Sequence, residues 1–237
     1  MSGLNPQSSV ELPASATTEE LLGDLNEIER KNAPEKLYFR GDRSLFRQTP
    51  RVAIVGSRNA TPEGLRRAGK LGRALVARGA VIVSGLAEGI DTAAHRAAIE
   101  TGGRTIAVLG TPLEKPYPAS NRVLFDEIAL RHLVVSQFAE NAAVRPANFP
   151  IRNRTMALIA HATVIVEAAE KSGTLHQAWE ALRLGRPLFV MESITRNQQL
   201  TWPAQVMKYG AQILSDTTFE DFVEQLPADK RELAVAF

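Results

Sequence analysis

Three segments of this chain repeat one pattern, in which an apolar, β-branched run ends in a loop of small residues and a helical pattern follows. The segments are residues 52–58, 81–91 and 164–174. In an open parallel α/β sheet such loops gather at the carboxyl ends of the strands, where free backbone N–H groups and helix N-termini favour anions. The repeated pattern therefore predicts a parallel α/β fold with a phosphate-binding crevice at one edge of its sheet.

Apolar runs of strand length alternate with helical stretches through most of the chain. The runs lie near residues 52–56, 81–84, 105–109, 133–136, 163–167 and 188–191. This alternation is typical of right-handed βαβ crossovers. With 237 residues, of which 44% are hydrophobic, the chain can bury one substantial core. We predict an α/β fold of three layers, a mostly parallel sheet with helices on both of its faces.

Residues with known positional preferences mark the helix boundaries. Thr61 and Pro62 fit the N-cap and the first position of a helix, and Gly79 fits its end. Leu65 belongs to the face of this helix that we expect to point inward. Asp91 is expected to cap the next helix.

The N-terminal region lacks this alternation. Residues 1–16 show no periodicity and are predicted to form a tail. Thr17 or Thr18 can cap one helix whose apolar face holds Leu21, Leu22, Leu25 and Ile28. We divide the chain into an N-terminal tail and helix (1–33), a main domain (34–226) that begins with a short edge strand at 36–41, and a C-terminal tail (227–237).

Composition narrows the classes of function. The chain has 28 Lys and Arg residues and 26 Asp and Glu residues, which gives a formal net charge of only +2. Nucleic-acid binding would therefore require a local basic patch, because the chain as a whole is not strongly basic. The absence of cysteine excludes disulfides, thiolate catalysis and cysteine-based metal sites, and the four histidines lack metal-ligand spacing. The apolar runs are too short to span a bilayer, and residues 1–6 do not read as a signal peptide. We expect a cytoplasmic protein that binds no metal, cofactor or membrane.

The first two loops contain candidate phosphate ligands. In the first loop, Gly56 allows close backbone approach, Ser57 offers a hydroxyl, and Arg58 offers a planar fork of donors suited to phosphate. The second loop holds Ser84, Gly85 and Gly89, but it does not match the Gly-x-Gly-x-x-Gly fingerprint of dinucleotide sites. The two loops therefore indicate phosphate binding without a dinucleotide cofactor.

Three further segments add donors and an aromatic ring. The third loop opens a helix with hydroxyl and backbone donors from Ser172, Gly173 and Thr174. A cluster of phosphate and base donors precedes a helix expected to begin near Thr155, and consists of Arg152, Asn153 and Arg154. A turn near residue 117 supplies a ring that can stack on a base, together with neighbouring polar groups, in Lys115, Tyr117 and Asn121.

Taken in order, these motifs resemble the DNA-processing protein A family, also called DprA or Smf. The resemblance covers about residues 34–190 and is carried by residues 56–58, 84–91, 105–110, 117–121, 149–154, 172–175 and 185–186. Residues 191–193 depart from the family pattern, and few residues follow the last predicted helix, so we expect a minimal, diverged member.

The resemblance implies a Rossmann-like domain that binds single-stranded DNA, forms a homodimer and assists loading of the recombinase RecA during transformation or recombination. Carried over to this chain, it implies that Arg58 holds the phosphate backbone and that residues 152–154 line the pocket. The Ser84–Gly85 and Ser172–Thr174 loops would supply backbone donors. It implies no catalytic residue.

Two alternatives use the same crevice. Related phosphoribohydrolases cleave nucleoside monophosphates with a glutamate that follows a Gly-Thr loop, but the corresponding residue here is Gln177, which cannot act as a carboxylate acid or base. Glu167 and Glu180 remain as substitutes for that glutamate. A sensor of free nucleotides is the other alternative.

Overall fold

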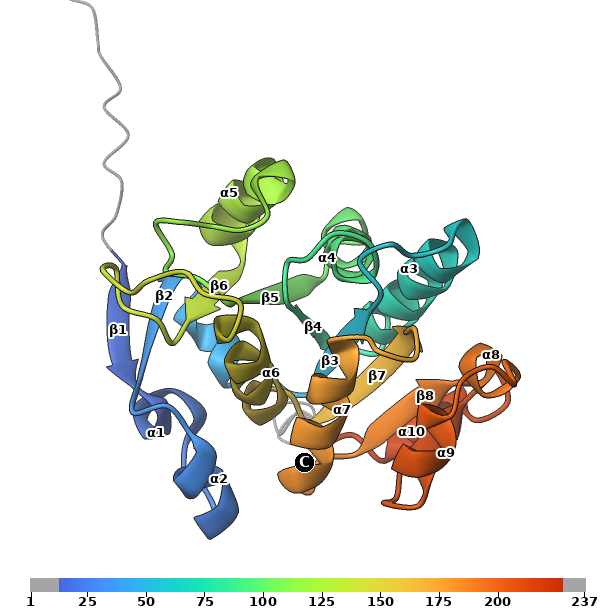
Figure 1. Cartoon of the computed structure of the whole chain (residues 1–237). Coiled ribbons are helices and arrows are strands. Elements are labelled where there is room, and N and C mark those ends of the chain that lie inside the picture. Colours follow the sequence, from blue (N-terminus) through green and yellow to red (C-terminus); the bar gives the residue numbers. More distant parts are fainter. Residues whose placement is uncertain (1–12, 228–237) are drawn as a thin grey trace, which may run out of the picture.

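A nine-stranded sheet forms the centre of the molecule in the computed structural model, which describes residues 13–227 (Figure 1). The strand order is β1-β2-β6-β5-β4-β3-β7-β8-β9. The strands from β3 to β9 pair in parallel, and β1 and β2 add an antiparallel edge. Their bounds are Ala14–Thr17, Lys36–Gly41, Arg51–Gly56, Val81–Ser84, Arg104–Leu109, Leu133–Ser136, Ala162–Glu167, Leu188–Met191 and Gln212–Leu214.

The helices form a layer on each face of the sheet. Helices α3, α4 and α5 lie along one face in Figure 1, and α6 and α7 lie along the other. Their bounds are Pro62–Val76, Ile90–Glu100, Arg122–Arg131, Asn148–Ile159 and Thr174–Arg183. Three short helices follow β8, namely α8 (Glu192–Thr195), α9 (Trp202–Met207) and α10 (Phe219–Glu224). The predicted three-layer α/β fold is confirmed.

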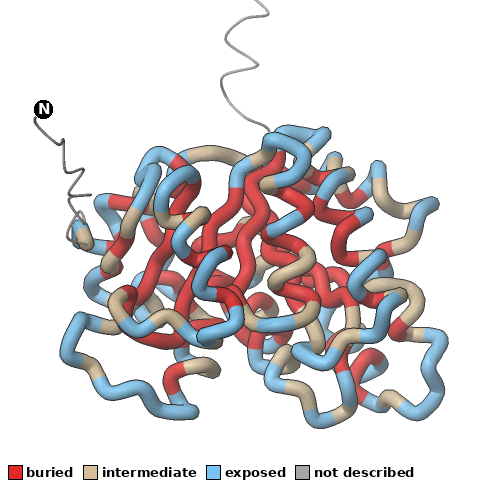
Figure 2. Tube along the Cα trace, turned by 90° about the horizontal axis from the view of Figure 1, so that it is seen from above, coloured by how far each residue is buried: buried red, intermediate tan, exposed pale blue. Residues whose placement is uncertain are grey.

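Successive side chains of the central strands point alternately toward the two helical layers. Along β3, Ile54 packs with the α3 and α4 side, while Val55 packs with the α6 and α7 side. Both side chains are buried, because a parallel sheet covered on two faces needs apolar residues on each face of its strands. Figure 2 shows the buried strands as a continuous red centre with the exposed loops around it.

The N-terminal region differs from the sequence-based prediction. Residues 1–12 of the predicted tail lie outside the described residues, but Ala14–Thr17 is a strand that pairs with β2, so the tail prediction is wrong there. Strand β2 therefore lies inside the sheet, between β1 and β6, and not at its edge. One predicted helix is two, α1 (Thr18–Leu22) and α2 (Glu27–Asn32), with N-caps at Thr17 and Asn26.

Three further details of the predicted helices are wrong. Leu65 of α3 is 38% exposed, because the inward stripe of this helix runs through Ala68, Leu71 and Leu75. The N-cap of α4 is Gly89, with φ of 76°, so Asp91 lies inside the first turn. Helix α6 begins at Asn148 rather than near Thr155, which places Arg152 within a helix and not before one.

Candidate functional site

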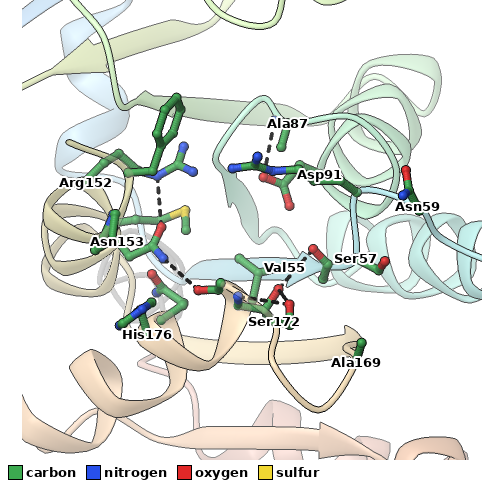
Figure 3. Close-up of a pocket in the computed structure, with 18 residues that line it drawn as sticks. Val55, Ser57, Asn59, Ala87, Asp91, Arg152, Asn153, Ala169, Ser172 and His176 are labelled. Carbon is green, nitrogen blue, oxygen red and sulfur yellow. Dashed lines mark hydrogen bonds between the residues drawn. The ribbon is translucent and has the colours of Figure 1, made fainter. Parts of the chain in front are cut away.

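A cavity of about 330 Å³ opens at the carboxyl edge of the sheet between β3 and β7. The chain winds from β3 to β6 in one direction and then crosses back to place β7 on the other side of β3. Loops diverge at such a switch point and leave a crevice, which is where open α/β sheets bind ligands. Figure 3 shows side chains that line the cavity from α4 (Asp91), α6 (Arg152, Asn153) and α7 (His176).

The first loop presents a guanidinium at the rim of this cavity. Gly56 is required for close packing, since a Cβ there would lie 2.6 Å from the Ile90 side chain and 2.8 Å from the Glu167 carbonyl oxygen. The Ser57 backbone N–H donates to that same carbonyl at 2.7 Å, so it is not free to bind phosphate. Arg58 is exposed, and its guanidinium lies 5.4 Å from the centre of the Phe149 ring, which holds the charge at the mouth of the cavity.

Arg152 is a buried cation, only 6% exposed, whose guanidinium is held on several sides. Its Nη1 donates to the carbonyl oxygens of Gly85 (2.6 Å) and Val108 (2.5 Å), and its Nε donates to Asn153 Oδ1 at 3.0 Å. Among the described residues, Nη2 has no hydrogen-bond partner. Because Arg152 lines the cavity, this nitrogen is a fixed and unused donor at the site.

The electrostatics of the cavity favour an anion between its two arginines. Burial lowers the pKa of Arg152, the nearby Asp91 carboxylate raises it, and the positive charge of Arg58 lowers it again. The guanidinium nevertheless stays protonated, because an arginine pKa begins far above neutrality. A phosphate at the mouth would relieve the repulsion between Arg58 and Arg152.

The second loop is held from within rather than free to bind. Asp91 accepts from the Gly85 N–H at 3.0 Å, and burial raises the pKa of its carboxyl group although Arg152 favours the ionised form. Ser84 is fully buried and donates to the Ile54 carbonyl at 2.7 Å. Gly89, with positive φ, has Ser57 and Arg58 carbonyl oxygens where a side chain would lie. Ser84 and Gly89 therefore shape the loop and lie outside the lining of the cavity.

The third loop lies across the cavity at the start of α7. The Ser172 hydroxyl accepts from the Thr174 N–H at 3.1 Å, and the Thr174 hydroxyl donates to the Gly56 carbonyl at 3.1 Å. This last bond ties the third loop to the first. Ser172, Gly173 and Thr174 all line the cavity, as the sequence pattern predicted.

The aromatic turn adds a ring beside the cavity. Tyr117 is 53% exposed and packs edge-on against Phe149 with ring centres 5.6 Å apart. Together with Arg58 and Arg152 it lines a small adjoining pocket. Asn121 is instead buried and donates to the Leu86 carbonyl (2.9 Å) and the Thr92 hydroxyl (2.8 Å), so it supports the second loop.

Two predicted basic ligands do not line the cavity. Arg154 lies on α6 and forms an ion pair with Glu180 of α7, with 3.1 Å between Nε and Oε2. The expectation that it lines the pocket is wrong, because in a helix the residue two positions after Arg152 points to a different face. Lys115 is exposed and lies outside both cavity linings.

Sequence reasoning left out several residues that line the cavity. They are Val55, Asn59, Ala87, Asp91, Phe149, Pro150, Met156, Ala169, His176 and Gln177. For Phe149 a signal existed, since an aromatic residue directly precedes Pro150 in the segment that carries the arginines. For Gln177 a signal also existed, since it follows the loop that ends at Thr174, at the position of the catalytic glutamate of the related hydrolases. For Met156 no local signal existed, because its place follows from how α6 packs on the sheet.

Comparisons with known proteins agree with this architecture. The family model described as DNA recombination-mediator protein A matches residues 16–227. DNA processing protein DprA of Streptococcus pneumoniae is 41% identical over 168 residues, which are 71% of this chain and 58% of that protein. The chain spans about half to two thirds of the length of the first curated relatives that it matches, from 46% to 65%.

Solved structures resemble this one in the same way. The X-ray structure of DprA from S. pneumoniae has a TM-score of 0.78 at 31% identity, covering 92% of this chain and 76% of that one. DprA from Helicobacter pylori, whose structure concerns single-stranded DNA binding by that protein, has a TM-score of 0.73 at 30% identity. That match covers 89% of this chain and 94% of the other. The fold, the order of the motifs and these matches together show that the chain belongs to the DNA recombination-mediator protein A family, also called DprA or Smf.

Proposed function

We propose that this protein is a recombination mediator that binds single-stranded DNA in the cavity between β3 and β7. The observation that carries the proposal is a pair of arginines that line the cavity. Arg58 is exposed at the rim, and Arg152 lies further inside with an unused Nη2 donor. Both lie at the switch point of the sheet. The family match and the single-stranded DNA binding of the H. pylori relative support the same ligand.

The neighbouring aromatic rings fit a polynucleotide better than a lone phosphate. Proteins that bind single strands combine cations for the backbone with rings on which bases stack. Here Tyr117 and Phe149 pack edge-on beside Arg58, with Tyr117 largely exposed to a passing strand. We propose that Arg58, Arg152 and the loop from Ser172 to Thr174 hold phosphate, and that Tyr117 stacks on a base.

The carboxylates near the cavity favour binding over hydrolysis. Glu167 accepts from the Thr61 N–H at 2.9 Å, and Glu180 pairs with both Arg154 and Arg183. Gln177 occupies the position where the related hydrolases have their glutamate. Because both glutamates are engaged by these partners, neither is free to replace the catalytic glutamate of the related hydrolases, which supports a non-enzymatic role.

The proposal extends to the partners that family membership implies. We propose that the protein works in the cytoplasm as a homodimer and assists RecA on the strand that it holds. An exposed apolar pair supports a protein interface: the rings of Trp179 and Tyr209 pack edge-on at 5.3 Å and are 37% and 69% exposed. No helix between residues 13 and 227 has the length and apolarity to cross a membrane.

A salt titration of oligo(dT) binding tests the site. Arg58→Ala removes one phosphate contact, so we expect weaker binding at low salt and a slope of log K against log[salt] that is shallower by about 0.7. The matched control is Arg131→Ala, an exposed arginine in the last turn of α5, outside the cavity lining. Fluorescence anisotropy gives both quantities. If wild type does not bind at low salt, or if the two variants behave alike, the proposed site is wrong.

A further inference from the structure

A second cavity, of about 500 Å³, opens beside α3 at the carboxyl ends of β8 and β9, and we call it the α3 groove. Between residues 13 and 227 it shares no lining residue with the cavity between β3 and β7. Its volume is within the usual size of pockets for small ligands. Apolar side chains line its inner part, among them the buried Leu71 and Leu214 and the half-buried Phe219. Four basic side chains line it as well, namely Arg66, Arg67, Lys70 and Arg196.

The α3 groove already holds one anionic group of this chain. Asp216 lies in the segment after β9, and its Oδ1 is 2.7 Å from the Nζ of Lys70. The hydrogen bond and the positive charge of Lys70, together with the charge of Arg66, lower the pKa of the Asp216 carboxyl group. A carboxyl pKa falls where the surroundings favour negative charge. The basic side chains therefore stabilise an anion at this point of the groove.

The cations of the groove outnumber the carboxylates that pair with them. Arg66 and Arg67 share the carboxylate of Glu63, at 2.6 and 3.0 Å. Lys70 and Arg196 each pair with one further carboxylate, so among the described residues three carboxylates face four cations. The side chains of Lys70 and Asp216 are 59% and 87% exposed, and exposed ion pairs contribute little stability. A ligand with several negative charges can therefore displace Asp216 from Lys70.

Carboxylates also separate the α3 groove from the cavity proposed for DNA. Glu167 ends β7, which lies between β3 and β8, and Glu170 follows in the next loop. These two carboxylates accept hydrogen bonds from Thr61 and Thr201, neither of which is a cation. A phosphate backbone that continued along this edge of the sheet would pass both carboxylates and be repelled. The groove therefore suits a separate and compact anion better than a continuation of the strand.

We propose that the α3 groove binds a nucleoside polyphosphate, with its phosphate groups on Lys70 and Arg66 and its base on the Phe219 ring. Lysine and arginine are the usual phosphate-binding residues, the first as a point charge and the second as a planar fork of donors. A half-buried aromatic ring among apolar side chains offers a surface on which a base can stack. The site is independent of the one proposed for single-stranded DNA.

Isothermal titration calorimetry at low salt and without divalent cations tests the proposal. The ligands are adenosine triphosphate, inorganic triphosphate and adenosine, which separate the contributions of the phosphates and the base. The variants are Lys70→Ala, which removes a cation of the groove, and Asp216→Asn, which removes the carboxylate that the ligand must displace. The matched controls are Lys208→Ala and Asp221→Asn, the same changes at exposed positions outside the groove lining. Thermal unfolding checks that each variant is folded.

We expect wild type to bind adenosine triphosphate at least about fivefold more tightly than inorganic triphosphate, as one stacked base predicts. Adenosine alone should bind more weakly than either. Lys70→Ala should weaken binding of adenosine triphosphate about tenfold, because it removes a charge-assisted contact. Asp216→Asn should strengthen binding about two- to fivefold, because an exposed ion pair no longer has to be broken. Both controls should stay within about twofold of wild type.

Three results would overturn the inference. Wild type does not bind adenosine triphosphate, or it binds inorganic triphosphate equally tightly, or the two groove variants behave like their controls. Two further measurements locate the bound nucleotide. Loss of its binding in Arg58→Ala, with Lys70→Ala unaffected, assigns it to the cavity between β3 and β7, and competition by oligo(dT) in wild type assigns the groove to the strand; either result overturns the inference. All of these outcomes leave oligo(dT) binding, and with it the proposed function, intact.

Discussion

At the scale of single residues, the cavity depends on a buried guanidinium that lies directly against a glycine. The Nη1 of Arg152 donates to the carbonyl of Gly85, and a Cβ at residue 85 would lie 2.2 Å from that same nitrogen. Arg152 has little freedom to move, because Val108 and Asn153 hold it as well. Because Gly85 has no side chain, the Arg152 guanidinium can lie directly against the backbone of the second loop.

Gly85→Ala is expected to displace the Arg152 guanidinium. The buried charge would then lose part of its hydrogen bonding to the Gly85 and Val108 carbonyl oxygens. We expect a loss of stability of about 2–4 kcal/mol and weaker binding of oligo(dT), since breaking buried charged contacts is costly. Gly173→Ala is the matched control, because its Cβ would meet nothing within 4 Å and its φ of −59° suits alanine. Urea denaturation compares the stability of the two variants, for which Gly173→Ala is the control, and fluorescence anisotropy compares oligo(dT) binding by Gly85→Ala and wild type. Equal stability of the two variants would show that Arg152 adjusts freely.

At the scale of elements, Thr61 connects the start of α3 to the end of β7, the strand that pairs with β3. Thr61 caps α3 by accepting from the Gly64 N–H at 3.0 Å. Its own N–H and hydroxyl donate to the Glu167 carboxylate at the end of β7, at 2.9 and 2.5 Å. The cap therefore fixes the start of α3 relative to the two strands that flank the cavity.

Thr61→Ala removes the cap and the hydroxyl contact with Glu167. We expect the free energy of unfolding to fall by about 1–2 kcal/mol, the usual cost of losing an N-cap. Thr61→Ser keeps the hydroxyl and should fall by less than half as much. Urea denaturation monitored by circular dichroism compares the three proteins, and an alanine variant as stable as wild type would contradict a structural role for the cap.

At the scale of the whole molecule, buried neutral histidine makes the fold sensitive to acid. The Thr105 hydroxyl donates to the Ile82 carbonyl at 2.8 Å, so in its 2.7 Å contact with His95 the Nδ1 is the donor. His95 is fully buried and its Nε2 finds no partner between residues 13 and 227. Burial lowers the pKa of His95 to about 3, since the charged form cannot be hydrated there.

Because the folded pKa lies below the unfolded value of about 6.5, the unfolded chain takes up the proton first as pH falls. The stability associated with neutral His95 is complete above about pH 6.5 and is lost progressively down to about pH 3. Between pH 7.5 and 5 we expect His95 to account for a loss of about 2 kcal/mol. Urea denaturation at the two pH values should show a smaller loss in His95→Gln by that amount. The same loss in both proteins would contradict the assignment.

The local features of this protein can be predicted from its amino-acid sequence alone. Apolar β-branched runs between helical stretches predicted the six strands from β3 to β8, and the small-residue loops predicted the edge of the sheet at which Arg58, Ser172 and Thr174 line a cavity. These features depend on periodicity and on the conformational preferences of short segments, which neighbouring residues carry. The family resemblance came from the same ordered motifs.

Which polar groups are free to bind a ligand depends instead on contacts between distant segments of the folded chain. Ser84, Asn121 and Arg154 have the residue types of ligands, yet each is engaged by a partner at least 26 positions away in the chain. Conversely, Gln177 is buried where α7 packs over β7, and between residues 13 and 227 only its Nε2 has a partner, the Thr163 hydroxyl, while its Oε1 has none. Hydrogen-bond partners and burial depend on contacts between distant segments, so a linear pattern can name a donor or an acceptor but cannot show whether it is already engaged.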